Sequence, residues 1–303
     1  ASVTNNAPAV FPVGTTIVTW SVTDIHGNIT DTATQSVTVI DNQRPTISAT
    51  NINVNNDAAK CGASIAIAQP ITADNCGVAT VMGVRSDNQL LTADYPVGTT
   101  TITWTVRDIH GNINSTIQTI VVTDNEKPVI ACSANQVFCA NTGGNTQYTI
   151  PALSQSDNCG IASTTYTVTG ATNRTGTGTN ASGSFAIGTS TVTFTVTDIH
   201  GNVSTCSFTV TINPLPVASI AAANADALCN QFVLTGNSTL SGPFTYQWLY
   251  NSTTKASTQQ LSLGLTDADG IYSLYTTDVN GCRSELAATY NYQKQNLISS
   301  YTI

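Results

Sequence analysis

Charged side chains are scarce in this sequence: they make up 9% of its 303 residues and include only two Glu and four Lys. Exposed helix faces are usually built from such residues, so their scarcity argues against a helical protein. β-branched residues, Ser, Asn and Gly predominate instead, which is typical of strands joined by polar turns. We therefore expect an all-β protein.

Long apolar runs are also missing. No stretch approaches the roughly 18–20 residues that a membrane-spanning helix needs, so no membrane insertion is expected in this segment. The formal net charge of −8 makes nucleic acid an unfavourable partner. The sequence opens in the middle of a repeat at Ala1, which predicts that it is a piece of a longer protein.

CxxC pairs are absent, and the three histidines lie far apart in the sequence, so the pattern does not offer the four closely spaced ligands of a zinc site. The eight cysteines are an even number, which favours disulfides over metal binding. Disulfides form in oxidising compartments. The expected location is therefore extracellular, either secreted or at the cell surface.

An internal repeat dominates what the sequence does contain. Residues 14–28, 98–112 and 188–202 read GTTIVTWSVTDIHGN, GTTTITWTVRDIHGN and GTSTVTFTVTDIHGN. The copies follow one another by 84 and 90 residues, the size of a small β-sandwich. ADNCG at 73–77 is repeated as SDNCG at 156–160, and VIDNQRP at 39–45 as VTDNEKP at 122–128.

Each copy alternates apolar and polar residues with period 2, the pattern of a half-buried strand. An aromatic residue (Trp20, Trp104 or Phe194) stands at the same place in each copy and is expected to anchor a core. The DIHGN segment predicts a hairpin turn, with Gly at the position of positive φ.

The repeat predicts the domain boundaries. We expect tandem immunoglobulin-like β-sandwich modules forming an elongated rod: a partial repeat at 1–40 that lacks its own core, full repeats at 41–123 and 124–213, a different module at 214–293, and a tail or the start of another module at 294–303. In the fourth module, YQWLY at 246–250 suggests an immunoglobulin strand with its core Trp248. DADGIY at 267–272 suggests a tyrosine corner at Tyr272.

The repeat also suggests disulfide pairs. Cys132 and Cys206 are both replaced in the preceding repeat, by Ala49 and Thr116, as expected if the two bond to each other. The remaining pairs are then predicted as Cys139–Cys159, Cys61–Cys76 and Cys229–Cys282. Each bridge would stabilise its module by about 2–4 kcal/mol.

Residues 1–213 resemble the hyalin repeat (HYR) family, through PVI, SDNCG and FAIGTSTVTFTVTDIHGNVSTCSFTVTI with their spacing. The resemblance implies extracellular immunoglobulin-like sandwiches linked to adhesion, which occur in long arrays in giant surface adhesins of gliding bacteria. The module after residue 213 is similar to the immunoglobulin-like or PKD-like modules that accompany such arrays. The resemblance thus implies a stalk segment of a surface adhesin.

Acidic residues recur where modules meet, and they suggest calcium as a cofactor. Calcium prefers six to eight hard oxygen ligands. The candidate ligands are Asp41, Asn42, Asp74 and Asp108 at one junction, and Asp124, Glu126, Asp157 and Asp198 at the next. The alternative is that each Asp or Asn only caps its own turn through backbone hydrogen bonds.

No catalytic centre is expected. A catalytic role for His26, His110 and His200 would require a partner nucleophile or carboxylate, and we interpret them as exposed turn residues. The predicted function is a non-catalytic spacer in a secreted or surface-anchored adhesin. Its partners would be neighbouring modules, surface glycans or other adhesin chains.

Two alternatives remain open. The modules could accompany the catalytic domain of a large secreted enzyme, or the module at 214–293 could bind carbohydrate. In the second case the stacking surface would come from five aromatic residues, namely Tyr246, Trp248, Tyr250, Tyr272 and Tyr275.

Overall fold

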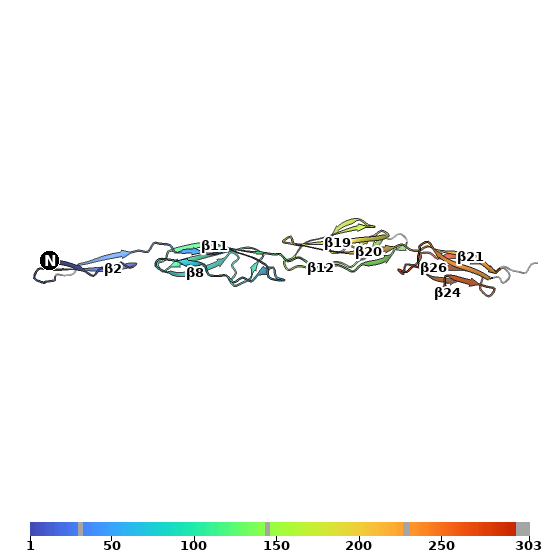
Figure 1. Ribbon diagram of the computed structural model, residues 1–303, viewed down its shortest axis with the longest axis horizontal. Helices are drawn as coiled ribbons and strands as arrows, with labels where there is room; N and C mark the ends of the chain where they lie inside the picture. Colours follow the sequence, from blue (N-terminus) through green and yellow to red (C-terminus); the bar gives the residue numbers. More distant parts are fainter. Residues whose placement is uncertain (30–32, 143–145, 227–230, 295–303) are drawn as a thin grey trace, which may run out of the picture. The chain divides into compact units, whose positions relative to one another are not determined.

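The computed structural model describes residues 1–29, 33–142, 146–226 and 231–294. It divides into two compact units, unit 1 (residues 1–126) and unit 2 (residues 127–303). The prediction of an all-β protein is confirmed, because the described residues contain many strands and no α-helix (Figure 1). These residues accordingly include no helix long and apolar enough to cross a membrane.

Unit 1 is built from short strands and one long hairpin. Its strands are β1 (Ser2–Asn5), β2 (Gly14–Thr23), β3 (Ala33–Val39), β4 (Thr46–Ser48), β5 (Ile52–Asn55), β6 (Gly62–Ala63), β7 (Ile71–Ala73), β8 (Val78–Arg85), β9 (Tyr95–Pro96), β10 (Gly98–Asp108) and β11 (Ile113–Thr123). The sheets have the orders β1-β2-β3, β5-β11-β10-β8, β4-β7 and β6-β9. β5 runs parallel to β11, and all other pairs are antiparallel.

The core of unit 1 follows from the alternation in β10. Ile102, Trp104 and Val106 are at most 1% exposed, whereas the threonines between them face outward. The Trp104 indole N–H donates to Gln118 Oε1 at 2.9 Å, so its one polar atom is satisfied. Gly83 lies opposite on β8, where a Cβ would come within 2.8 Å of the indole ring. Only glycine fits against this ring without displacing it.

The first repeat has the same hairpin but little to pack it against. In the described part of residues 1–40, Val18 is the one buried hydrophobic side chain. Trp20 is only partly buried, and its indole N–H donates to Gln35 Oε1 at 3.3 Å. A single three-stranded sheet covers one face of such a residue, while a sandwich covers both.

Unit 2 contains two sandwiches in sequence. Its strands are β12 (Val129–Ala131), β13 (Gln136–Cys139), β14 (Gln147–Tyr148), β15 (Ser154–Ser156), β16 (Ile161–Gly170), β17 (Arg174–Thr177), β18 (Gly183–Ser184), β19 (Gly188–Asp198), β20 (Val203–Asn213), β21 (Ala218–Asp226), β22 (Gln231–Ser238), β23 (Thr245–Tyr250), β24 (Thr253–Ala256), β25 (Gln260–Leu263), β26 (Gly270–Thr277) and β27 (Ala288–Tyr292). We call 127–213 its first module and 214–294 its second module.

The first module of unit 2 repeats the plan of unit 1. Its main sheet has the order β13-β20-β19-β16-β17, with β13 parallel to β20, and β19 and β20 lie side by side (Figure 1). Phe194 is 1% exposed and takes the place of Trp104 in the core. Two small sheets, β12-β15 and β14-β18, complete the module.

The second module has sheets β21-β22-β25 and β24-β23-β26-β27, all antiparallel. Trp248 is fully buried, as predicted, and donates from its indole N–H to the carbonyl of Thr258 at 3.0 Å. The Tyr272 hydroxyl donates to the carbonyl of Ala268 at 3.1 Å, which is the hydrogen bond expected of a tyrosine corner.

One of the predicted disulfides is confirmed. Cys132 and Cys206 are bonded with an S–S distance of 2.00 Å, and they join the segment after β12 to β20. Their equivalents Ala49 and Thr116 in unit 1 were the signal for this pair, because two bonded cysteines are lost together.

The other predicted pairs are wrong. Cys139 bonds to Cys282, so neither Cys139–Cys159 nor Cys229–Cys282 forms. Cys229 itself lies outside the described residues. Cys76 is a free thiol, whereas Cys61 and Cys159 are both disulfide-bonded, so Cys61–Cys76 does not form either.

The reason is the length of the modules. Cys139 pairs with Asn213 at the C-terminal end of β20, whereas Cys159 lies beside the turn that precedes this strand, where Ile199 N–H donates to the carbonyl of Gly160 at 3.1 Å. A strand of 11 residues separates the two places by about 35 Å, far more than the roughly 6 Å between the Cα atoms of a disulfide. The sequence repeat shows equivalence between modules, but it does not show at which end of a module each cysteine lies.

Candidate cation site and inter-module disulfide

The DIHGN segments form one recurrent turn. In the second copy, Asp108 Oδ1 accepts hydrogen bonds from the backbone N–H of His110 at 2.9 Å and of Asn112 at 2.8 Å. Asp108 Oδ2 accepts from the Asn112 side chain at 2.7 Å, and Gly111 takes a φ of 101°. The copies at Asp24 and Asp198 have the same bonds. Each of these three aspartates therefore caps its own turn.

These bonds hold the aspartates in the ionised form. Burial raises the pKa of Asp108, but hydrogen bonds from Asn112, His110 and Gly111 outweigh that effect and leave the pKa below its usual value. The pKa of Asp198 is lowered by the same balance of causes. The pKa of Asp24 is lowered first by the Asn28 side chain.

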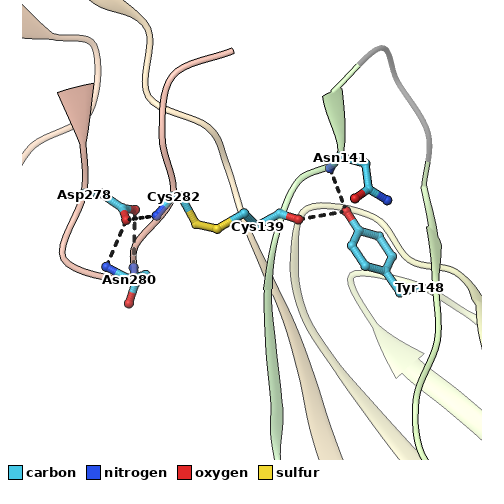
Figure 2. Close-up of a disulfide and its surroundings, with 6 residues drawn as sticks. All are labelled: Cys139, Asn141, Tyr148, Asp278, Asn280 and Cys282. Atoms are coloured by element: carbon cyan, nitrogen blue, oxygen red, sulfur yellow. Dashed lines mark hydrogen bonds between the residues drawn. A yellow bond between two sulfur atoms is a disulfide. The ribbon is translucent and has the colours of Figure 1, made fainter. Parts of the chain in front are cut away.

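A fourth copy of the turn occurs in the second module of unit 2 and was missed in the sequence. Residues 278–282 read DVNGC, with Cys282 where the other copies have Asn. Asp278 Oδ1 accepts from the backbone N–H of Asn280 at 2.9 Å and of Cys282 at 2.8 Å (Figure 2). The D-x-x-G spacing could have identified this turn from the sequence.

Three predicted calcium ligands come together in unit 1. Carboxylate oxygens of Asp41, Asp74 and Asp108 all lie within 4.8 Å of one another. Asp41 precedes β4, Asp74 follows β7 and Asp108 ends β10, so three separate segments position the cluster. Asn42, predicted beside them, is exposed.

The donor set fits a hard cation. Asp74 Oδ1 caps its own turn, accepting from the backbone N–H of Cys76 at 2.8 Å and of Gly77 at 3.0 Å. Asp74 Oδ2 is buried and has no hydrogen-bond partner. Such an oxygen is costly to bury unless something compensates its charge, and calcium accepts carboxylate oxygens of this kind.

Two further side chains border the cluster. His110 Nδ1 lies 3.0 Å from Asp41 Oδ2, and the Cys76 thiol lies within 4.8 Å of both. Burial raises the pKa of the Cys76 thiol, and the nearby carboxylates raise it further, so the thiol stays protonated. A protonated thiol is a poor metal ligand, which leaves the oxygens as the better donors.

The second predicted set divides between the two units. Asp157 and Asp198 of unit 2 bring carboxylate oxygens within 4.8 Å of each other, and Asp157 Oδ2 is also buried without a hydrogen-bond partner. Glu126 of unit 1 serves instead as a cap: its two carboxylate oxygens accept from the Ala59 N–H at 3.0 and 3.1 Å. Asp124 is 5% exposed and accepts from the Glu126 N–H at 3.2 Å.

The three histidines behave as turn residues. His26, His110 and His200 are all exposed, and each follows the aspartate that caps its turn. Their exposure and their place in the turns agree with the interpretation from sequence, but His110 also has a carboxylate partner, Asp41.

The Cys139–Cys282 disulfide joins the two modules of unit 2. Figure 2 shows the bond between the end of β13 and the fourth copy of the turn. The Tyr148 hydroxyl donates to the carbonyl of Cys139 at 3.3 Å and accepts from the Asn141 N–H at 3.1 Å (Figure 2). Cys282 is 1% exposed. Both cysteines are therefore held by ordered structure.

Comparison with known proteins identifies the first module. Residues 123–212 match the family model of the HYR domain. These residues form an HYR domain. The match includes the SDNCG turn, the β19–β20 hairpin and the third DIHGN segment.

Two curated relatives extend the likeness beyond the HYR domain. Hyalin of Strongylocentrotus purpuratus is 33% identical over 225 residues, covering 71% of this chain and 17% of the relative. Hyalin of Lytechinus variegatus is 33% identical over 213 residues, covering 67% of this chain and 37% of the relative. The chain thus spans well under half of either hyalin.

Among solved structures, extracellular cadherin domains 1–4 of protocadherin gamma B7 match with a TM-score of 0.35 and 14% identity. The match covers 92% of this chain and 83% of the other.

Proposed function

We propose that this chain is a non-catalytic spacer segment of an extracellular adhesion protein, its modules being 1–40, 41–123, 124–213 and 214–293. The observation that supports this most is the repeat: the same hairpin, with an aromatic residue at the same position and the same capped turn, occurs three times among the described residues. A spacer needs many equivalent stable units, whereas an enzyme needs one distinctive site.

The finer proposal is a stalk in a surface adhesin of the type that gliding bacteria carry, with neighbouring modules, other adhesin chains or surface glycans as partners. The three disulfides among the described residues support an oxidising compartment, secreted or at the cell surface. Thr-rich outer strand faces and few charges suit a segment that resists proteases.

Small-angle X-ray scattering of the full chain tests the spacer proposal. A compact chain of 303 residues has a radius of gyration of about 19 Å. A stalk requires a value well above this, together with a pair-distance distribution that has a long tail. A radius near the compact value would refute it.

Immunogold electron microscopy with an antibody against the HYR domain tests the location. Label along surface filaments supports the adhesin stalk. If cells carried no label and the antibody instead recognised a larger catalytic chain in the medium, these modules would be accessory modules of a secreted enzyme.

Carbohydrate binding by the second module is less well supported. Trp248 and Tyr272, two of the five aromatics proposed for stacking, are fully buried in its core. Tyr246 and Tyr250 pack against that core and are only partly exposed.

We also propose that Asp41, Asp74 and Asp108 bind calcium in unit 1. The unpartnered Asp74 Oδ2 supports this, and among the described residues no Lys or Arg forms an ion pair with any of the three carboxylates. Bound calcium would tie the segment after β3 to the turns after β7 and β10.

Thermal melts of the full chain in calcium and in chelator test the site. Calcium should raise the melting point of unit 1, by the equivalent of about 2.7 kcal/mol at a hundredfold excess over the dissociation constant. Asp74→Asn should abolish this rise, because it keeps the Oδ1 acceptor and removes the charge. Asp278→Asn, the control, changes a capping aspartate outside the cluster and should retain it. A melting point indifferent to calcium would rule the site out.

A further inference from the structure

β8 lies at an open edge of the main sheet of unit 1. The sheet has the order β5-β11-β10-β8, so β8 pairs only with β10. The Ser86 N–H donates to the carbonyl of Thr101 on the β10 side. Backbone groups of an antiparallel strand point to its two sides alternately, so the N–H and C=O groups of Val81 and Gly83 point away from β10. Within the described residues, these groups pair with no other strand.

The HYR domain covers the same edge with an extra strand. Its β16 occupies the place of β8, because it pairs with β19 as β8 pairs with β10. β17 lies along the outer edge of β16 in the antiparallel direction. Tyr166 stands where unit 1 has Gly83, and it pairs with Gly176 of β17. An antiparallel strand is therefore what this edge accepts within the same protein.

Unit 1 lacks this extra strand because the segment after β8 folds differently. In the HYR domain, residues 171–187 follow β16 and include β17, whereas residues 86–97 separate β8 from β10 in unit 1. The shorter segment wraps around Arg85, whose guanidinium donates to the carbonyls of Leu90 and Ala93 at 3.0 and 2.8 Å. Arg85 is 2% exposed. The segment is thus anchored at the end of β8 and leaves the edge of the strand open.

The exposed side chains along this edge are apolar. Met82 and Val84 point to the outer face of the sheet and are 65% and 56% exposed, while Val81 packs against the core. The HYR domain has Thr165 and Thr167 at the positions of Met82 and Val84. Natural proteins usually protect an exposed edge with a charge, a proline or a bulge. From Val81 to Val84, β8 has none of these.

We propose that β8 pairs edge to edge, in the antiparallel direction, with β8 of a second copy of this chain. A two-fold axis can relate two identical antiparallel strands, so one surface serves both copies. With Met82 of the two copies opposite each other, Val81 of each copy faces Gly83 of the other and exchanges backbone hydrogen bonds with it. The two Met82 residues then form a non-hydrogen-bonded pair, the closer kind, with Cα atoms about 4.5 Å apart. Neither strand brings an exposed charge to this contact, so no like-charge repulsion opposes it.

The size of the contact sets its strength. Stable complexes bury about 1,200–2,000 Å² in total, and one pair of eight-residue strands provides less. Two chains in solution should therefore associate weakly and reversibly. Neighbouring stalks would raise the local concentration of this edge, which would favour lateral pairing. That use rests on the proposed spacer function, which scattering and microscopy test separately from self-association.

Sedimentation velocity of the full chain, at concentrations up to about 0.5 mM, measures the association. All samples carry Cys76→Ser, so that the free thiol cannot link chains. The test variants Met82→Lys and Met82→Glu each place two like charges opposite each other at the centre of the pair. The matched control Thr165→Lys adds the same charge at the equivalent position of the HYR domain, where β17 already covers the edge. Both positions are exposed, so circular dichroism melts should show intact folds.

The reference and Thr165→Lys should dimerise equally, whereas each Met82 variant alone should associate about tenfold more weakly. An equimolar mixture of Met82→Lys and Met82→Glu should recover dimerisation, because opposite charges then face each other. A reference chain that stays monomeric at the highest concentration would overturn the proposal. So would equal dimerisation of Met82→Lys and the reference, which would place the contact elsewhere, or a mixture that stays as weak as its components.

Discussion

Single aspartates decide the geometry of the turns in this protein. Asp108 and its counterparts accept two backbone N–H groups through one oxygen and leave the second oxygen for another partner. In Asp74 that second oxygen has no partner in the described structure, and the residue becomes part of a cluster. The second carboxylate oxygen of the capping aspartate is thus bonded within the turn in Asp108, whereas in Asp74 it is left for a ligand.

The lowered pKa of Asp108 predicts acid sensitivity. A carboxyl whose folded pKa lies below its unfolded value of about 3.9 stabilises the fold above that value, and the stabilisation is lost as the pH falls through the folded pKa. Asp108→Asn, measured in chelator, should lower the melting point at pH 7 and flatten its decline below pH about 4.

The control for this experiment is Asp94→Asn, an exposed carboxylate 3.2 Å from Lys60. An exposed ion pair contributes little, so its curve should follow the wild type. If Asp108→Asn and Asp94→Asn gave the same curves, the turn bonds would not be the cause of the acid sensitivity.

The repeated strand is buried to different extents in the first and second repeats. β2 and β10 carry the same sequence pattern, but β10 packs into a sandwich and β2 belongs to a three-stranded sheet. Trp104 is therefore 1% exposed, whereas Trp20 is only partly buried.

Truncating the two tryptophans should separate these roles. Trp104→Ala should cost about 3–5 kcal/mol in the free energy of unfolding of unit 1, because it opens a large cavity in the core. Trp20→Ala should cost much less, because water already reaches part of that ring. Chemical denaturation followed by circular dichroism measures both. Similar costs would show that the first repeat is packed as well as the second.

At the scale of the whole molecule, the two disulfides within unit 2 differ in kind. Cys132–Cys206 closes a loop within the HYR domain, and Cys139–Cys282 joins that domain to the next module. The first stabilises one fold, and the second limits how far two folds can separate.

The role of the internal bond can be tested by copying the unbridged repeat. Cys132→Ala with Cys206→Thr introduces the residues found at the equivalent positions, Ala49 and Thr116. We expect the HYR domain to lose about 2–4 kcal/mol and the melting transition of unit 1 to stay unchanged. Differential scanning calorimetry resolves the transitions. An unchanged HYR transition would mean that the strand packing alone sets its stability.

The sequence by itself determined the strand content, the buried aromatics Trp104 and Phe194, the tyrosine corner at Tyr272 and the capped turns, whereas Trp20, also expected to anchor a core, is only partly buried. These depend on alternation and on local hydrogen bonds, which a few adjacent residues specify. It also indicated Cys132–Cys206, because a bonded pair disappears together from a sister repeat.

Tertiary structure alone decided the partner of Cys139, whereas the repeat had already predicted that Asp41, Asp74 and Asp108 lie together. Spacing along the chain suggested Cys159 for Cys139, but an 11-residue strand holds those two cysteines at opposite ends of one module. Which ends of which modules meet depends on the packing of whole sandwiches. That packing brings Cys139 to Cys282 across 143 residues, a distance over which no local pattern in the sequence extends.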